Sequence, residues 1–433
     1  MKLEQTGISL QNFLNESPCN FIATQTISKH LESAGFKQLH QKDNWDVKPG
    51  DKVYFTKNDS SIFAIKVGKG NISDNGFRII TAHSDSPCFR IKPNPEITTE
   101  GGIVKLNTEV YGGPILYTWF DRPLSVAGRV LLRGKSALAP ETKFVNIHRP
   151  ILIIPHLPIH FNRAVNEGNP LSKQKDMLPV LGLITEEAER GNMLINLLCS
   201  HLNVDKSEII DFDLLLYPTA GAALVGAHNE FICSARIDDL SMAHAAMIAM
   251  IESNDDNQAT LVMGIFDNEE TGSGTKQGAA SPVLANILRR ISYSLNATES
   301  QFIQATANSF MISADNGHAF HPNYAEKFDP TNHPVQGGGP IIKMNANCKY
   351  MTDAKSAAVF AEICNKANVP VQYFVNHSDV AGGSTLGNIF TGQMEIEGVD
   401  VGNPIWAMHS CCETGTVIDQ YYMISAFSSF YNL

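Results

Sequence analysis

Residues 261–272 read LVMGIFDNEETG, a continuous apolar run followed by an acidic loop. Six apolar residues in a row, without alternation, are typical of a short strand that is buried on both faces of a parallel sheet. Glu269 and Glu270 stand just after this run. Because ligands of open α/β sheets bind outside the carboxyl ends of the strands, this stretch indicates both the kind of sheet and the edge at which a site is expected.

The same arrangement recurs on either side of this stretch. Phe77–Ala82 is a predicted strand that ends before His83, and Phe310–Ala314 is one that ends before Asp315. Alternating strands and helices predict a three-layer α/β sandwich. The helices are expected on both sides of Pro18 within about 8–35, and at 239–251, 281–294, 354–367, 384–389 and 417–432. Further strands are expected at 52–56, 61–67 and 371–375.

The stretch from 92 to 232 differs from its surroundings. It contains β-type runs such as 103–106, 125–132 and 144–147, punctuated by Gly and Pro. One helix is expected at about 184–201 and a further strand at 211–217. We therefore expect a catalytic domain formed by residues 1–91 plus 233–433, interrupted by an inserted, mostly β second domain at 92–232.

Composition excludes several classes of partner. Among 433 residues, Lys and Arg total 33 and Asp and Glu total 44, a formal net charge of −11. This balance argues against nucleic acid and anionic membranes as partners. The N-terminus has no apolar signal region, and no run of 18 or more apolar residues occurs. The eight cysteines form no CxxC pair, which favours a cytoplasmic protein with reduced thiols.

Five separated stretches carry side chains that bind metals. Two histidines, two aspartates and a glutamate pair are what two divalent ions about 3.5–4 Å apart require, with one carboxylate left over as a base. Zinc is the expected metal, and cobalt or manganese stay open because mixed nitrogen and oxygen ligands do not select sharply among them. The candidate residues are His83, Asp238, the pair Glu269 and Glu270, Asp315, and His409.

Each candidate has an alternative explanation. His83 can be a buried core histidine, although Asp85, two residues on, can accept from its second ring nitrogen. Asp238 can be a helix N-cap, or Asp239 can be the cap and leave Asp238 to bridge two metals. The glutamate pair can be a solvated acidic loop. Cys411 and Cys412 are expected to be core or incidental residues, because no second Cys pair completes a structural zinc site.

Taken in order, the motifs resemble the aspartyl aminopeptidase family of metallopeptidases. The resemblance extends over essentially the whole chain. It departs at Asp239, where the family often has Asn, and at 379–385, where a Pro-Cys-Gly form is more usual. The stretches that carry it are 81–87, 235–240, 267–272, 313–324, 339–345 and 407–410, with looser matches at 155–162 and 378–387.

The resemblance implies a site and an assembly. One metal would be held by His83 and Asp315 and the other by Glu270 and His409, with Asp238 bridging and Glu269 as general base. His318, Lys343 and Tyr350 stand where the family contacts substrate, and His160 resembles a histidine inserted by a neighbouring subunit. The inserted domain would then serve as a dimerisation or lid domain, within homodimers that build a dodecamer.

The expected activity is removal of the N-terminal residue of peptides by metal-activated water. The resemblance suggests acidic N-termini, with Lys343 pairing with the substrate carboxylate; otherwise Lys343 is an ordinary surface lysine. Two other functions stay open. One is an amidohydrolase or deacylase on the same metal shell, which would act on N-acylated substrates. The other is a non-catalytic assembly or binding protein, which would have no use for a base at Glu269.

Overall fold

The computed structural model describes residues 2–186 and 191–433, and the chain divides into two compact units. Unit 1 comprises Met1–Asp85, Ala222–Met408 and Glu413–Leu433. Unit 2 comprises Ser86–Gly221 and His409–Cys412. The chain therefore leaves unit 1 and returns to it twice.

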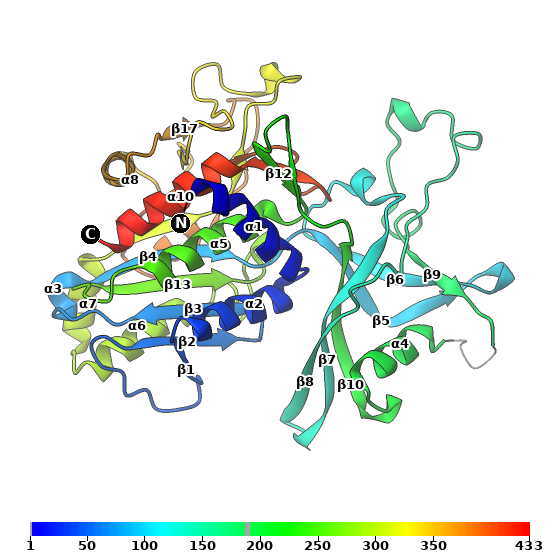
Figure 1. Ribbon diagram of the computed structural model, residues 1–433, viewed down its shortest axis with the longest axis horizontal. Helices are drawn as coiled ribbons and strands as arrows, with labels where there is room; N and C mark the ends of the chain where they lie inside the picture. Colours follow the sequence, from blue (N-terminus) through cyan, green and yellow to red (C-terminus); the bar gives the residue numbers. More distant parts are fainter. Residues whose placement is uncertain (1, 187–190) are drawn as a thin grey trace. The chain divides into compact units, whose positions relative to one another are not determined.

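The centre of unit 1 is a mixed sheet with the order β1-β2-β3-β13-β4-β14-β18-β16-β17 in the described part of the chain (Figure 1). Its three central strands, β13, β4 and β14, run parallel, so their carboxyl ends meet at one edge. The strands are β1 (Lys37–Gln38), β2 (Lys52–Lys57), β3 (Ser61–Lys66), β4 (Phe77–His83), β13 (Thr260–Phe266), β14 (Phe310–Ala314), β16 (Ile341–Lys343), β17 (Gln372–Phe374) and β18 (Glu397–Gly402). Smaller sheets pair β11 (Ala223–Val225), β12 (Phe231–Ser234) and β20 (Glu413–Thr416), and β15 (Gly317–His318) with β19 (Pro404–Ile405).

Helices cover both faces of this sheet (Figure 1). One core cluster contains α1 (Leu3–Glu16), α2 (Asn20–Ser33), α5 (Ile237–Glu252), α8 (Ala354–Lys366) and α10 (Val417–Tyr431). The other contains α3 (Ile72–Asn75), α6 (Val283–Ser294), α7 (Glu299–Ala307) and α9 (Leu386–Thr391). The predicted α/β fold is confirmed, including the two N-terminal helices on either side of Pro18.

The apolar side chains of β13 pack against both helical layers. Leu261, Met263 and Ile265 belong to the first cluster, whereas Val262 and Phe266 belong to the second. All seven residues of β13 are buried. Strands between two helical layers have no solvent-facing side, which is why the sequence shows a continuous apolar run here.

Unit 2 is a six-stranded antiparallel sheet with the order β8-β7-β10-β5-β6-β9 and its own core. Its elements are β5 (Cys88–Thr98), β6 (Ile103–Tyr111), β7 (Leu124–Ser136), β8 (Ala139–Asn146), β9 (Val180–Leu183), α4 (Met193–Leu202) and β10 (Ile209–Pro218). The helix expected at about 184–201 begins later, at Met193, and residues 187–190 of that expectation lie outside the described residues. Residues 223–232, which were predicted to belong to the inserted domain, contribute to β11 and β12 of unit 1, and β12 pairs with β20.

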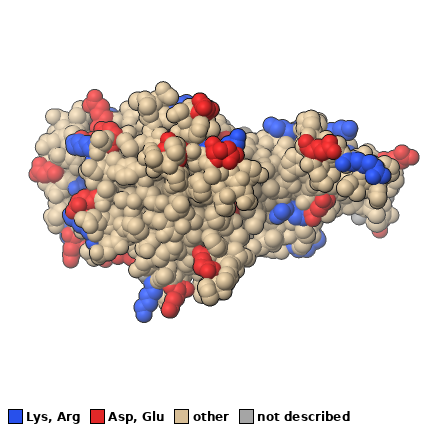
Figure 2. Space-filling model, turned by 90° about the horizontal axis from the view of Figure 1, so that it is seen from above, with Lys and Arg blue, Asp and Glu red and all other residues tan. Residues whose placement is uncertain are grey.

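Figure 2 shows basic and acidic side chains interspersed over the visible face of the molecule. Neither sign forms one continuous patch on that face, so the net negative charge is dispersed there. Among the described residues, no helix combines the length and the apolar character needed to cross a membrane.

A buried histidine in unit 1 provides a test of acid stability. His244 is 1% exposed, with Ser9 Oγ 2.9 Å from Nε2 and Gln420 Nε2 3.1 Å from Nδ1. Burial lowers the pKa of His244 to about 3, with a smaller contribution from His30. Below pH 6.5, His244 therefore binds a proton in the unfolded chain but not in the folded chain. The free energy of unfolding consequently falls as the pH falls.

We expect this histidine to contribute a loss of up to ~4 kcal/mol between about pH 6.5 and pH 3. His244→Gln should flatten the pH dependence of unfolding between pH 6.5 and 4.5, as measured by urea denaturation at a series of pH values. The exposed His40→Gln is the matched control and should leave the slope unchanged. An unaltered slope in His244→Gln would contradict the assignment.

Candidate metal and catalytic site

The predicted strand ends meet at one edge of the unit 1 sheet. His83 closes β4, Asp315 directly follows β14, and Glu269 and Glu270 follow β13 in a short 3-10 turn. Phe266 pairs with His83 across the β13–β4 ladder, so the two strand ends lie side by side. Asp238 reaches the same edge from the first turn of α5.

Within unit 1, the side chains form two overlapping groups suited to hold a metal. His83, Asp238, Asp239 and Asp315 each offer one ligand atom, all within 4.8 Å of one another, and all four residues are buried. His83 with Glu269 and Glu270 forms a second group by the same criterion. His83 Nε2 lies 3.6 Å from Asp238 Oδ1. Imidazole and carboxylate ligands at such spacing suit a divalent transition metal.

Asp85 orients both His83 and the glutamate pair. His83 Nδ1 lies 3.0 Å from the Asp85 carbonyl oxygen and 3.4 Å from Asp85 Oδ1. The Asp85 carboxylate accepts from the backbone N–H of Glu269 and of Glu270, both at 3.1 Å. Asp85 thus fixes the turn that presents the two glutamates, which makes it a positioning residue in this structure.

Asp239 does not cap α5, which was one of the two possibilities left open by the sequence. Its Oδ2 accepts from the His83 N–H at 3.1 Å, and its Oδ1 accepts from the N–H and the side-chain amide of Asn316, both at 3.2 Å. The residue at the N-cap position is Arg236, with φ 66°, whose Nε donates to the Ser17 carbonyl at 3.1 Å. Asp239 therefore ties β4 to the loop after β14, a role that only the long-range contacts reveal.

A second buried acid supports the glutamate turn. Asp267 Oδ1 accepts from Asn20 Nδ2 at 2.9 Å and from the Asn268 N–H at 2.8 Å. Burial, with the neighbouring Asp85 charge, raises the pKa of Asp267 to about 7. Neither Asp267 nor Asn20 was singled out from the sequence, because nothing local marks them as neighbours.

The site concentrates negative charge away from water. Burial raises the pKa of Glu269 to about 8; the His83 charge opposes this rise and Asp315 adds to it. Burial likewise raises the pKa of Asp239 and of Asp315. Burial opposes protonation of His83, yet the nearby Asp239 and Asp85 carboxylates raise its pKa well above the usual range. A buried cluster of carboxylates favours the binding of cations, so these residues fit a metal centre.

Lys343 is buried, not on the surface. It is 4% exposed, and its Nζ donates to the Asn316 carbonyl at 2.8 Å and lies 3.4 Å from Asp315 Oδ1. The same Nζ is 5.9 Å from the centre of the Tyr350 ring. Burial opposes the charge on Lys343, but Asp315 more than compensates, so its pKa is raised. Lys343 therefore connects the metal-binding group with Tyr350.

Tyr350 and His318 line a small cavity of about 160 Å³ in unit 1, which we call the side-chain pocket. Its size suits one amino-acid side chain. Its remaining lining residues are Lys327, Phe328, Asp329, Phe374, Val375, Asn376, His377, Val380, Ala381, Gly382 and Gly383. Tyr350 lines the side-chain pocket, Lys343 lies near the Tyr350 ring, and Asp315 lies beside Lys343. The pocket is therefore next to the predicted metal ligands.

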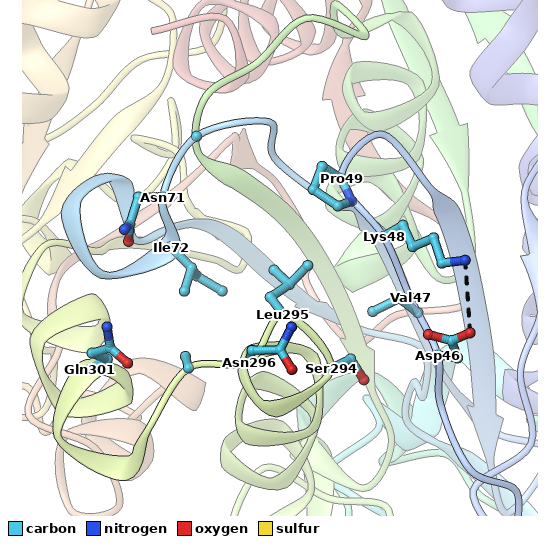
Figure 3. A pocket seen from close by; sticks show the side chains of 12 residues that line it. Asp46, Val47, Lys48, Pro49, Asn71, Ile72, Ser294, Leu295, Asn296 and Gln301 are labelled. Carbon is cyan, nitrogen blue, oxygen red and sulfur yellow. Dashed lines mark ion pairs between the residues drawn. The ribbon is translucent and has the colours of Figure 1, made fainter.

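Figure 3 shows the side chains that line a second cavity, of about 430 Å³. Its lining includes Asn71 and Ile72, which precede β4, and Leu295 and Asn296, which follow α6. His83 stands at the opposite end of the strand. This cavity is therefore separate from the group of metal-binding side chains.

Two predicted site residues belong to unit 2. His160 is exposed in a turn in which the Phe161 N–H donates to the Pro158 carbonyl. His409 Nδ1 lies 3.1 Å from the Gly113 carbonyl oxygen. Within unit 1, the structure brings together His83, Asp238, Glu269, Glu270 and Asp315, whereas the approach of His160 and His409 to them stays a prediction.

Comparison with known proteins agrees with this geometry. The family model described as "Aminopeptidase I zinc metalloprotease (M18)" matches residues 13–431. A relative from Clostridium novyi (strain NT), "Probable M18 family aminopeptidase 2", is 52% identical over 98% of both chains. In "Cryo-EM structure of the Ape4 and Nbr1 complex", a 35% identical chain matches with a TM-score of 0.95, covering 99% of this chain and 86% of that one. In "Structure of S. cerevesiae mApe1 dodecamer", identity is 25% and the TM-score is 0.86, covering 99% and 97%.

Proposed function

Because the chain belongs to the M18 family, the aspartyl aminopeptidases, and is a zinc-dependent metalloaminopeptidase, we propose that it removes acidic residues from peptide N-termini at a two-metal site. The observation that carries this proposal is the buried group of one histidine and three aspartates, overlapping the glutamate pair. His83 and Asp315 would hold one ion, Glu270 and His409 the other, and Asp238 would bridge them. Zinc is the metal proposed for both positions.

When bound, such ions polarise a carbonyl and lower the pKa of water. Glu269 acts as general base: it accepts a proton from the attacking water and passes it to the leaving amine. Burial supports this role, because it raises the pKa of Glu269 from the usual carboxylate range to about 8, which makes the carboxylate a stronger base. Asp85 holds the Glu269 backbone in place while the proton moves.

The side-chain pocket is the proposed binding site for the N-terminal side chain of the substrate. His318 and Tyr350 line it, and the Lys343 ammonium lies behind the Tyr350 contact, 5.9 Å from its ring centre. A compact cation next to a pocket of one side chain's size favours a carboxylate of Asp or Glu. His160, from a neighbouring subunit, would complete the oxyanion environment.

Lys343→Met is expected to reduce selectivity for acidic substrates. The variant also removes the ion pair to Asp315, so kcat/KM should fall for every substrate. For Asp-peptides we expect a further loss of about tenfold, equal to ~1.4 kcal/mol, mainly in KM. The measurement is kcat/KM on matched Asp- and Leu-peptides, with the exposed Lys355→Met as control. Equal losses on both peptides would contradict the assignment.

We also propose a homodimer-based dodecamer, because a similar structure is that of a dodecamer. We propose the cytoplasm as its location, because the eight cysteines are scattered without a CxxC pair. In unit 2, the turn around His160 exposes apolar side chains, with Leu157 at 57%, Ile159 at 54% and Phe161 at 80%. Clusters of this kind favour protein contacts. Unit 2 would then act as the dimerisation or lid domain. Light scattering at native concentration tests the assembly, and a monomer would overturn it.

The decisive experiment is metal analysis combined with a fluorogenic substrate panel. The panel should present each N-terminal amino acid with a free α-amine, together with N-acetylated Asp and Leu controls. Two metal equivalents and highest turnover on Asp or Glu with a free amine are expected. Turnover of the N-acetylated substrates alone would instead indicate a deacylase.

A further inference from the structure

Asp400, in β18, makes contacts that its place in the core does not require. Its side chain is completely buried. Oδ1 accepts from Thr385 Oγ1 at 2.6 Å, and Oδ2 accepts from the Met351 N–H at 2.6 Å. Its own N–H donates to Thr352 Oγ1 at 2.8 Å. A buried carboxylate is costly unless hydrogen bonds compensate for its lost hydration, and here both oxygens are engaged.

The groups that bind Asp400 are close in sequence to two segments that line the side-chain pocket, which we call its two walls. Met351 directly follows Tyr350, which belongs to one wall. Thr385 lies two residues after the segment 380–383, which is the other wall, and directly precedes α9. Gly387 packs directly against the carboxylate, because a Cβ built there would lie 2.4 Å from Asp400 Oδ2. One buried side chain thus joins both walls.

We propose that Asp400 is a positioning residue that holds the two walls of the side-chain pocket at a fixed separation and thereby sets selectivity for the N-terminal side chain. The proposal rests on the proposed function, which assigns that pocket to the substrate. Asp400 touches no reacting atom. It acts through Thr385 on one side and through the backbone of Met351 on the other.

Asp400 is also adjacent to the metal-binding edge. The next residue of β18, Val401, accepts a hydrogen bond at its carbonyl from the Asp315 N–H at 2.9 Å. A large change at Asp400 therefore risks disturbing Asp315 as well. The hydroxyl of Thr385 is a better target, because it bears on one wall alone.

The test compares Thr385→Val, which removes the hydroxyl at nearly constant volume, with Thr385→Ser, which keeps it. Thr391→Val is the matched control at the other end of α9, since its exposed hydroxyl donates to the Asn388 carbonyl at 2.7 Å. We expect Thr385→Val to raise KM for an Asp-peptide about tenfold, with kcat changed less than about twofold, and to reduce the Asp/Leu selectivity ratio. Thr385→Ser should restore both values, and Thr391→Val should match the wild type.

Metal content and Tm are measured on every variant. Asp400→Asn is the second variant; it should reduce the same ratio with both metals retained, because the amide nitrogen cannot accept a hydrogen bond as the carboxylate oxygen does. An unchanged Asp/Leu ratio in Thr385→Val, or a parallel loss on both peptides that Thr385→Ser fails to restore, would overturn the proposal. A wild-type enzyme without preference for acidic residues would instead defeat the proposed function, independently of these variants.

Discussion

Glu269→Gln is expected to lower kcat by about 10³-fold while leaving the fold and the metal content unchanged. General acid–base catalysis contributes roughly 10²–10⁴-fold, and an amide of the same shape cannot accept the proton. The backbone N–H of Glu269, which donates to Asp85, is retained in the variant. Pre-steady-state and steady-state turnover of an Asp-peptide should be measured together with zinc content by mass spectrometry.

The matched control for Glu269→Gln is Glu362→Gln, at an exposed position of α8. It should turn over substrate at the wild-type rate. Turnover in Glu269→Gln within about tenfold of the wild type would show that another group accepts the proton. A variant that lost its metal as well would instead identify Glu269 as a ligand.

Removal of the metal is expected to abolish turnover and to make stability depend on pH in the opposite sense from His244. Without a cation, burial raises the pKa of Glu269 to about 8, so the folded chain holds a proton that the unfolded chain has released. Between about pH 4.5 and pH 8 the folded state therefore binds more protons, and the free energy of unfolding falls as the pH rises. The metal-free protein should be most strongly destabilised at the alkaline end of that range.

Thermal unfolding with and without a chelator, at pH 5.5 and at pH 7.5, measures this effect. The chelator should lower Tm more at pH 7.5. Free metal at about 100 times its Kd stabilises a single site by ~2.7 kcal/mol, which sets the scale of the expected shift. Restoring zinc should restore both Tm and activity. An equal decrease in Tm at both pH values would contradict the charge distribution described for the site.

The sequence predicted the layers of the fold because each layer leaves a local signal. The apolar run of β13 indicated burial on both faces, and the ends of β4, β13 and β14 indicated the edge at which His83, Glu269 and Asp315 meet. The resemblance to the aspartyl aminopeptidases is confirmed by the family match.

What the sequence missed depends on long-range contacts. Asp239 was one of two candidates for the helix cap, because a carboxylate at a helix start often is one, whereas its partners here lie on β4 and after β14. Lys343 follows Asp315 by 28 residues in the sequence, so no local pattern indicates that it is buried against that carboxylate. Asp400 was not noticed, because a single acid in an apolar strand does not show which loops it binds.

Because the chain alternates between the two units, the two units cannot be completed at the same stage of biosynthesis. Nearly all of unit 2 is one continuous segment, Ser86–Gly221, which leaves the ribosome early. The first helical layer of unit 1 contains α1 and α2 from the start of the chain together with α10 from its end. Part of the apolar surface of α1 and α2 therefore stays uncovered until α10 has been translated, and until then the nascent chain is prone to aggregation.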